Sequence, residues 1–301
     1  MNLTNIFSAV MLMTVSFSVF GQEQQPKKIK KISITDIYIQ SGFFSARNND
    51  GTPSDFKTLA PQSVLLNNIM PDFYQPGGFS SSSNNMFSVL LGLQFNDKPK
   101  TFYEGNPLLR VGISYISGTT LTGGLFDEVR KPYDTLTSSQ TGQTVYIDSI
   151  NTKNYSMSYS SEQLRLDGSL IFRTNPESRW SIFTGMGITA GVSFNANTNI
   201  YYNSNGKAEA RYANGNSLSS YGYSSSGNIK TEKFRNKTNI GLSIYIPLGI
   251  DFRIGKKREF WKRTHLFYEL RPGINVTSIP ELRPITNASV QHGIGLRVSW
   301  N

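Results

Sequence analysis

Residues 180–195 alternate between mostly apolar side chains and mostly small or polar ones. The even positions run from Trp180 through Ile188 to Phe194, and the odd positions are mostly Gly, Ser and Thr. Successive side chains of a β-strand point to opposite faces, so this period of two predicts a strand with one apolar face. A helix would mix the two sets around its circumference.

The same alternation recurs in seven further segments, so the sequence predicts eight strands. Apart from the last hairpin, connections of roughly 40 residues alternate with connections of 6 to 11. This order is typical of transmembrane barrels. The predicted fold class is all-β: an eight-stranded antiparallel transmembrane β-barrel with long extracellular loops and short periplasmic turns. The connections are 47–84, 96–106, 122–158, 174–179, 196–237, 254–263 and 278–286.

The composition of the two faces indicates which one points outward. One face of the predicted strands carries Ile, Leu, Val and Phe, and the other carries many glycines, including Gly187, Gly241, Gly273 and Gly295. Glycine marks close packing in strands, which suits the crowded interior of an eight-stranded barrel better than a water-exposed surface. We therefore expect the apolar face to contact lipid and the glycine-rich polar face to line the lumen.

The N-terminus predicts export. Residues 6–20 form an apolar stretch of signal-peptide length, and small residues precede a cleavage site after Gly21. A short membrane anchor is the alternative. The predicted organisation is a signal peptide at 1–21, a basic periplasmic segment at 22–34 and an outer-membrane barrel at 35–301. The chain has no Cys, which excludes disulfides and thiolate metal sites, and a Cys-free exported chain suggests a bacterial envelope protein.

Aromatic and basic residues gather at the predicted short turns. The three tryptophans, Trp180, Trp261 and Trp300, fall at the short-turn ends of strands and predict an interface girdle. The predicted periplasmic pieces carry twelve Lys and Arg against five Asp and Glu, which suits contact with anionic lipid headgroups. The predicted partners are outer-membrane lipids and proteins of the outer membrane or cell surface. Nucleic acid is not an expected partner, because these basic residues lie on turns of an exported chain.

Two stretches carry a family resemblance. Residues 163–173 and 180–191, joined by a short turn, resemble the small outer-membrane β-barrel proteins with an outer membrane protein beta-barrel domain, and so does the closing segment 293–300. The resemblance covers residues 35–301 and is one of pattern. It implies a place in the outer membrane without implying a defined activity. Trp300 is penultimate, whereas such families usually end in an aromatic residue.

The polar faces of the strands carry nine ionisable side chains that are predicted to point into the lumen. A lone buried charge costs on the order of several kcal/mol, so each must be paired or hydrated. We expect a structural network that plugs the lumen, in which Glu269 and Asp36 satisfy Arg271 and Arg297. A charge-lined ion path is the alternative. The nine residues are Asp36, Arg110, Arg165, Asp167, Asp251, Arg253, Glu269, Arg271 and Arg297.

Motifs for catalysis lack a fitting context. Residues 185–191 resemble a dinucleotide-binding loop, but they lie within a strand. His292 falls on the lipid face of the last strand, where ionisable groups suggest function. Some eight-stranded outer-membrane barrels are lipid A-modifying hydrolases with a His and a Ser on the lipid side, but Ser289 and Ser299 point the other way. We expect no enzyme activity, no catalytic residue, no cofactor and no metal.

Two long connections carry residues suited to contacts. Tyrosines lie among Ser, Asn and Gly in 196–237, which is the composition of a binding loop and also of a solvated hairpin. Residues 56–70 hold enough apolar side chains for a short element that caps the barrel mouth. The candidate binding-loop residues are Tyr201, Tyr202, Tyr212, Tyr221 and Tyr223.

Together these features predict a non-enzymatic integral outer-membrane barrel. It would act as a scaffold, in adhesion, or as an accessory component of a larger cell-surface or secretion complex. The alternatives are a lipid A-modifying enzyme and a narrow pore.

Overall fold

The computed structural model of the 301-residue chain describes residues 32–47, 49–67, 69, 81–95, 107–175, 178–216, 218, 224–255 and 257–300. The predicted signal peptide at 1–21 lies outside the described residues, as does most of the predicted basic segment at 22–34. Among the described residues, no helix is long and apolar enough to cross a membrane.

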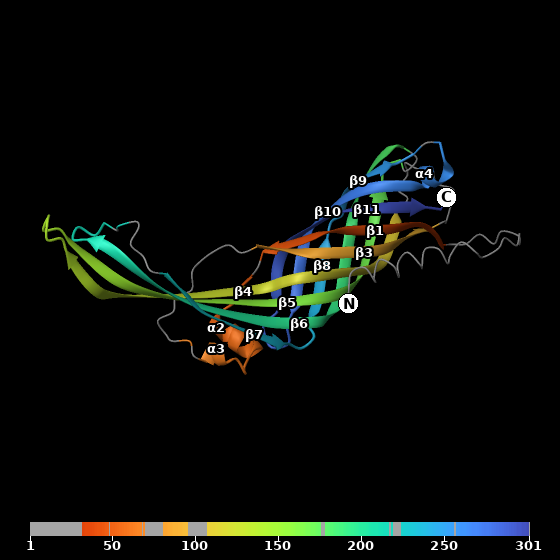
Figure 1. Cartoon of the computed structure of the whole chain (residues 1–301). Coiled ribbons are helices and arrows are strands. Elements are labelled where there is room, and N and C mark those ends of the chain that lie inside the picture. Colours follow the sequence, from red (N-terminus) through yellow and green to blue (C-terminus); the bar gives the residue numbers. More distant parts are fainter. Residues whose placement is uncertain are drawn as a thin grey trace, which may run out of the picture. The chain divides into compact units, whose positions relative to one another are not determined.

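The described chain is built almost entirely from antiparallel strands, with three short helices (Figure 1). The strands are β1 (Ile32–Arg47), β2 (Asn49–Asp50), β3 (Ser81–Phe95), β4 (Leu108–Thr137), β5 (Thr144–Arg173), β6 (Trp180–Tyr212), β7 (Ser224–Arg235), β8 (Ile240–Tyr245), β9 (Leu248–Arg253), β10 (Thr264–Ser278) and β11 (Ile285–Ser299). The helices are α2 (Pro53–Leu59), α3 (Val64–Asn67) and α4 (Glu259–Arg263).

The strands close into a ring of eight positions, as the sequence predicts. The order is β1, β3, β4, β5, β6, then β8 with β9, then β10 and β11, and β11 pairs with β1 to complete the circle. Strands β8 and β9 share one position, because both pair with β6 on one side and β10 on the other. The break between them falls at Pro247, whose nitrogen has no hydrogen to donate to a strand ladder.

The register around the ring shows how strongly the strands are staggered. A path that leaves β11 at Leu296 and follows directly paired residues around the barrel returns to β11 at Thr286, ten residues away. Closure of a barrel requires a stagger of this kind together with strands tilted from the barrel axis. The path runs Leu296, Ile39, Val89, Ile113, Leu166, Ala190, Leu242, Val276, Thr286.

The two faces of the ring have opposite character. The outward side chains form an exposed apolar band that contains no Asp, Glu, Lys or Arg, whereas the inward side chains are buried and largely polar. A water-soluble barrel would have the reverse arrangement, and this one is the arrangement of a transmembrane β-barrel. Members of the band include Leu91, Ile113, Leu166, Ile182, Met186, Ile244, Ile250, Ile274 and Ile294.

Three strands continue well past the band, which the sequence interpretation did not predict. The predicted strand ends near 121, 159 and 195 are wrong, because the β4–β5 ladder continues to Thr137 and Thr144 and the β5–β6 ladder continues to Val145 and Tyr212. Strand β7 pairs with the extended part of β6, so a projecting sheet of β4, β5, β6 and β7 leaves the ring (Figure 1).

The pattern of the ring does not continue unchanged into the extensions, because their apolar side chains change face. Within the ring the apolar residues of β5, such as Leu164 and Leu166, point outward and are exposed. Further along the same strand the buried residues are Tyr155, Met157 and Tyr159, which point to the inner face. The alternation therefore continues in the opposite phase, which is a signal that the sequence does contain.

Candidate functional site

Four charged side chains meet in the middle of the lumen. Arg110 of β4 donates to Glu269 of β10 through two hydrogen bonds, Nη1 to Oε2 at 2.7 Å and Nη2 to Oε1 at 2.8 Å. Arg271 lies 2.7 Å from Glu269 through Nε and 2.8 Å from Asp167 through Nη1. All four side chains are 0% exposed. Two cations and two anions therefore neutralise one another in what we call the central cluster.

Neutral side chains complete the hydrogen bonding of the central cluster. Ser114 donates to Asp167 Oδ2 at 2.9 Å, and the hydroxyl of Tyr245 donates to Asp167 Oδ1. Ser169 accepts from Arg110 Nε at 3.0 Å, and Gln40 Oε1 accepts from Arg271 Nη2 at 3.0 Å. Buried charges are tolerated where partners of this kind satisfy the remaining donors and acceptors.

A second group of charges lies toward the end with the short turns. Arg297 Nη1 donates to Asp36 Oδ1 at 2.8 Å, and Arg297 Nε lies 2.8 Å from Asp251 Oδ2. The latter contact is an ion pair without an aligned hydrogen bond, because both atoms lack a hydrogen-bond partner by geometry. Asp251 Oδ1 also lies 2.6 Å from His265 Nδ1, and Arg173 approaches Asp251 at 3.7 Å.

The structure brings together seven of the nine predicted lumen residues in these two groups. It pairs Glu269 with Arg271 and Asp36 with Arg297, as expected from the sequence. The sequence interpretation assigned no role to His265 or Arg173, although their phase already placed both on the lumen face.

The other two predicted lumen residues have no carboxylate partner among the described residues. Arg165 is 2% exposed and donates to neutral acceptors, at 2.8 Å to Gln163, 2.7 Å to Ser243 and 2.8 Å to Asn275. Arg253 lies at the short-turn end, and its Nε is buried without a hydrogen-bond partner. These two arginines therefore stand outside the predicted charge network.

An apolar layer separates the two charged groups. It consists of Tyr38, Leu90, Ile171, Phe183 and Phe267, which pack together and are each at most 2% exposed. The guanidinium of Arg110 lies over the rings of Tyr38 and Phe183, at 5.4 and 5.5 Å from their centroids. Large side chains thus fill the lumen at this level, with cation–π contacts linking the layer to the central cluster.

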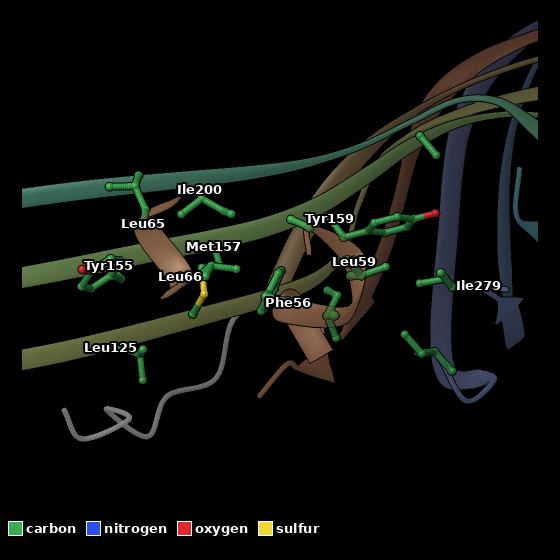
Figure 2. Close-up of a cluster of buried hydrophobic side chains, with 14 residues drawn as sticks. Phe56, Leu59, Leu65, Leu66, Leu125, Tyr155, Met157, Tyr159, Ile200 and Ile279 are labelled. Atoms are coloured by element: carbon green, nitrogen blue, oxygen red, sulfur yellow. The ribbon is translucent and has the colours of Figure 1, made fainter. Parts of the chain in front are cut away.

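The two helices between β1 and β3 overlap residues 56–70, which were predicted to form a short element that caps the barrel mouth, and they cover the inner face of the extended strands. Figure 2 shows Leu59 of α2 between Tyr159 and Ile279, and Leu66 of α3 beside Met157, and Phe56 of α2 belongs to the same cluster. Thr52 is the N-cap residue of helix α2 and forms a capping box with Asp55. This apolar cluster explains why the extended strands bury residues on their inner face.

One carboxylate of β7 holds α3 in place. Glu232 accepts a hydrogen bond from the hydroxyl of Ser63, and its Oε1 accepts one from the backbone nitrogen of Leu65 at 3.3 Å. Asn236 adds a hydrogen bond from Nδ2 to the carbonyl oxygen of Leu59 at 2.7 Å. These hydrogen bonds therefore hold the helices against the projecting sheet, together with the apolar packing.

The predicted tyrosine loop is largely a strand, and its tyrosines do not share one surface. Tyr201 and Tyr202 are consecutive residues of β6 and therefore point to opposite faces. Tyr202 packs against Tyr155 with ring centroids 4.8 Å apart, whereas Tyr201 is exposed on the outer face. Tyr212 ends β6 opposite Val145. Tyr221 and Tyr223 lie outside the described residues.

The three tryptophans lie at the short-turn end, where the sequence places them. Trp180 begins β6 and Trp261 lies in α4. Trp300 follows β11, and its backbone nitrogen donates a hydrogen bond to the carbonyl oxygen of Thr35. All three are exposed. Aromatic rings at one end of an apolar band form a girdle of the kind found at membrane interfaces.

His292 points outward within the apolar band. Its ring lies beside that of Phe43, with centroids 5.7 Å apart, and Phe43 is its direct neighbour on β1. Ser289 and Ser299 lie elsewhere, and their hydroxyls are directed to the carbonyl oxygens of Gly273 and Arg263. Among the described residues, no group of three or more His, Asp and Glu could hold a metal ion.

The fold and the lumen together define a class: a small transmembrane β-barrel whose interior is filled by its own side chains. A scan of protein-family models found no match, and a search of curated proteins found none. Among solved structures, the chain is similar to Neisserial surface protein A, with 11% identity, coverage of 90% of this chain and 100% of that one, and a TM-score of 0.33.

Two further solved structures are similar over most of the chain. Ail of Yersinia pestis is 12% identical, with coverage of 88% of this chain and 99% of that one and a TM-score of 0.23. OmpT, an outer-membrane protein of Vibrio cholerae, is 10% identical, with coverage of 92% and 100% and a TM-score of 0.13. The ring of eight strand positions follows from the strand pairing of this chain itself.

Proposed function

We propose that this chain is a non-enzymatic integral protein of the bacterial outer membrane, exported through a cleaved signal peptide. In this proposal the barrel is a plugged anchor, and the projecting sheet is the working surface on the outside of the cell. The sheet serves as a scaffold or in adhesion, or joins a larger surface or secretion complex.

The observation that carries the proposal is the filled lumen. Strands β4 and β10 lie on opposite sides of the eight-position ring, so the Arg110–Glu269 pair bridges the interior. The apolar layer of Tyr38, Phe183 and Phe267 lies directly beneath it. Ions would have to break buried charge pairs to pass, which favours an anchor over a pore.

The projecting sheet supports the role of a presented surface. Near its tip, Asp148 pairs with Arg211 at 2.8 Å and with Arg130 at 3.4 Å, and Arg130 also reaches Glu209 at 2.8 Å. These pairs join β4, β5 and β6 far from the barrel. A sheet stiffened in this way suits contact with a protein partner.

Conductance and co-purification test the proposal. The full chain in planar bilayers should give no stable open pore, and protection of the barrel from added protease in vesicles of the same preparation is the control for insertion. Native gels and mass spectrometry after extraction from outer membranes should recover a protein partner, and a variant lacking residues 125–155 should lose it. A stable conducting state of the unaltered chain would contradict the plug.

The second candidate is a lipid A-modifying enzyme, and the observation that favours it is His292 on the lipid-facing side. Expression of the chain would then change the mass of lipid A, and His292→Ala would abolish that change. An unchanged lipid A mass supports the anchor instead.

A further inference from the structure

An ordered stack of three side chains lies at the short-turn end of the barrel, on its outer face. Trp180 of β6 and Phe252 of β9 are direct neighbours in register, with ring centroids 4.5 Å apart. The guanidinium of Arg179 lies over the Phe252 ring, 5.0 Å from its centroid. We call these three residues the Arg179 stack.

The backbone fixes the stack in place. The nitrogen of Arg253 donates to the carbonyl oxygen of Arg179 at 2.9 Å, so the end of β9 is tied to the start of β6. Trp180 lies at the short-turn end of the apolar band, and Arg179 directly precedes it in the sequence. The cation is therefore held on an aromatic ring at the level where an acyl chain gives way to a headgroup.

Basic residues outnumber acidic ones in the connection that follows β9. The turn and helix that follow β9 carry Lys257, Arg258, Lys262 and Arg263, all in the described residues. Within this described part of the rim, only Lys262 has a carboxylate partner, Glu259, at 2.7 Å. The hydrogen bond from Lys262 and its positive charge hold the pKa of Glu259 below its usual range, so this carboxylate stays charged but is already engaged.

We infer that the Arg179 stack is a binding site for an anionic phospholipid of the periplasmic leaflet, with the lipid phosphate on Arg179 and an acyl chain along Trp180 and Phe252. This inference rests on the proposed membrane location. A guanidinium already stacked on an aromatic ring loses little side-chain freedom when it binds phosphate, and its planar fork matches phosphate oxygens.

The outward direction of the stack selects a lipid over a soluble anion. Trp180 and Phe252 are paired positions on the lipid-facing side, as are the neighbouring Ile182 and Ile250. A soluble anion would gain nothing from these apolar neighbours. An anionic phospholipid has both a phosphate for Arg179 and an acyl chain for the apolar side chains. A zwitterionic phospholipid lacks the net negative charge that the basic residues attract.

Tryptophan fluorescence can test the inference, because all three tryptophans lie at this end. A Trp261→Phe, Trp300→Phe background leaves Trp180 as the reporter. The mature chain is reconstituted in phosphatidylcholine vesicles that contain increasing brominated phosphatidylglycerol, or brominated phosphatidylcholine for comparison. We expect brominated phosphatidylglycerol to quench Trp180 at a mole fraction about fivefold lower.

Matched variants separate the site from general attraction to the membrane. Arg179→Gln should abolish the preference, and Arg179→Lys should retain only part of it, because the charge stays but the stacked planar fork is lost. Arg283→Gln, which changes an exposed arginine in the β10–β11 connection at the opposite end, should leave the preference unchanged.

The outcomes also separate this inference from the proposed function. Equal quenching by both brominated lipids, or a preference that survives Arg179→Gln, would overturn the phospholipid site and leave the membrane barrel standing. Absence of quenching by either lipid would contradict the membrane location itself.

Discussion

Arg110 and Glu269 lie 159 residues apart in the sequence and face each other across the barrel through two hydrogen bonds of 2.7 and 2.8 Å. Parallel hydrogen bonds between a guanidinium and a carboxylate are strong and directional. Because their strands are on opposite sides of the ring, this pair joins the two halves of the barrel wall from within.

Glu269→Ala should therefore strongly destabilise the barrel. It leaves Arg110 and Arg271 buried beside each other without their shared carboxylate, and breaking a buried pair in this way costs ~3–5 kcal/mol. Urea unfolding of the full chain in detergent, followed by circular dichroism, measures the loss. Glu259→Ala, at an exposed ion pair of the rim, is the control and should change stability little.

A compensated variant tests the cause of that loss. Arg110→Met combined with Glu269→Leu removes both partners and leaves Arg271 paired with Asp167. Much of the stability should return, since apolar replacement of a buried pair is often close to neutral. A double variant as unstable as Glu269→Ala alone would show that lost packing, and not the unpaired charge, is responsible.

Two glycines should respond differently to alanine. A β-carbon at Gly187 would collide with the ring of Tyr245, which donates to Asp167 of the central cluster. A β-carbon at Gly168 has no atom within 4 Å. Gly187→Ala should cost ~1–3 kcal/mol by overpacking, and Gly168→Ala should be neutral or stabilising. Thermal unfolding monitored by tyrosine fluorescence compares them, and equal effects would contradict the close contact.

Removal of the carboxylate that holds α3 should loosen the cap. Glu232→Ala deprives Ser63 and the Leu65 nitrogen of their acceptor, at ~1–3 kcal/mol of local stability. Limited trypsin digestion should then cleave after the exposed Lys57 about fivefold faster or more. Lys233→Ala, the next residue along β7 and on its opposite face, is the control. An unchanged cleavage rate in Glu232→Ala would show that apolar packing alone holds the helices.

The tip of the projecting sheet should depend on Asp148. Its side chain is 2% exposed between Arg130 and Arg211, so Asp148→Ala leaves two arginines without their common partner. We expect faster amide hydrogen exchange in residues 144–150 and 207–212. Asp127→Ala removes a looser ion pair with Lys153, at 3.8 Å, and should change exchange much less. Equal acceleration in both variants would argue against a special role for Asp148.

The ring was predictable because lipid and lumen impose opposite chemistry on alternate residues. Apolar residues stay on the same face before and after the break at Pro247, as Ile240, Leu242, Leu248 and Ile250 show. The sequence therefore predicts one strand where the structure has the two short strands β8 and β9. The extended parts of β4, β5 and β6 were not predicted, because outside the apolar band the helices cover the inner face and reverse the phase.

The lumen contacts were only partly predictable. The alternation of side chains along each strand places Asp36 and Arg297 on the lumen face of adjacent strands, and from this their ion pair could be predicted. The bridge from Arg110 to Glu269 could not follow from phase, because it depends on the ring order and on the stagger of the strands. The neutral surroundings of Arg165 likewise come from β8 and β10, which are distant in sequence.

The Arg110–Glu269 pair also makes the stability of the assembling barrel depend on its last strands. Arg110 and Asp167 belong to the first half of the ring, whereas Glu269 and Arg271 arrive only with β10. In the central cluster of a nascent barrel that lacks its last two strands, Arg110 would lack Glu269 and Asp167 would lack Arg271. Final closure supplies both counter-ions at once, so a truncated chain should fail to insert stably even though six of its eight wall positions are intact.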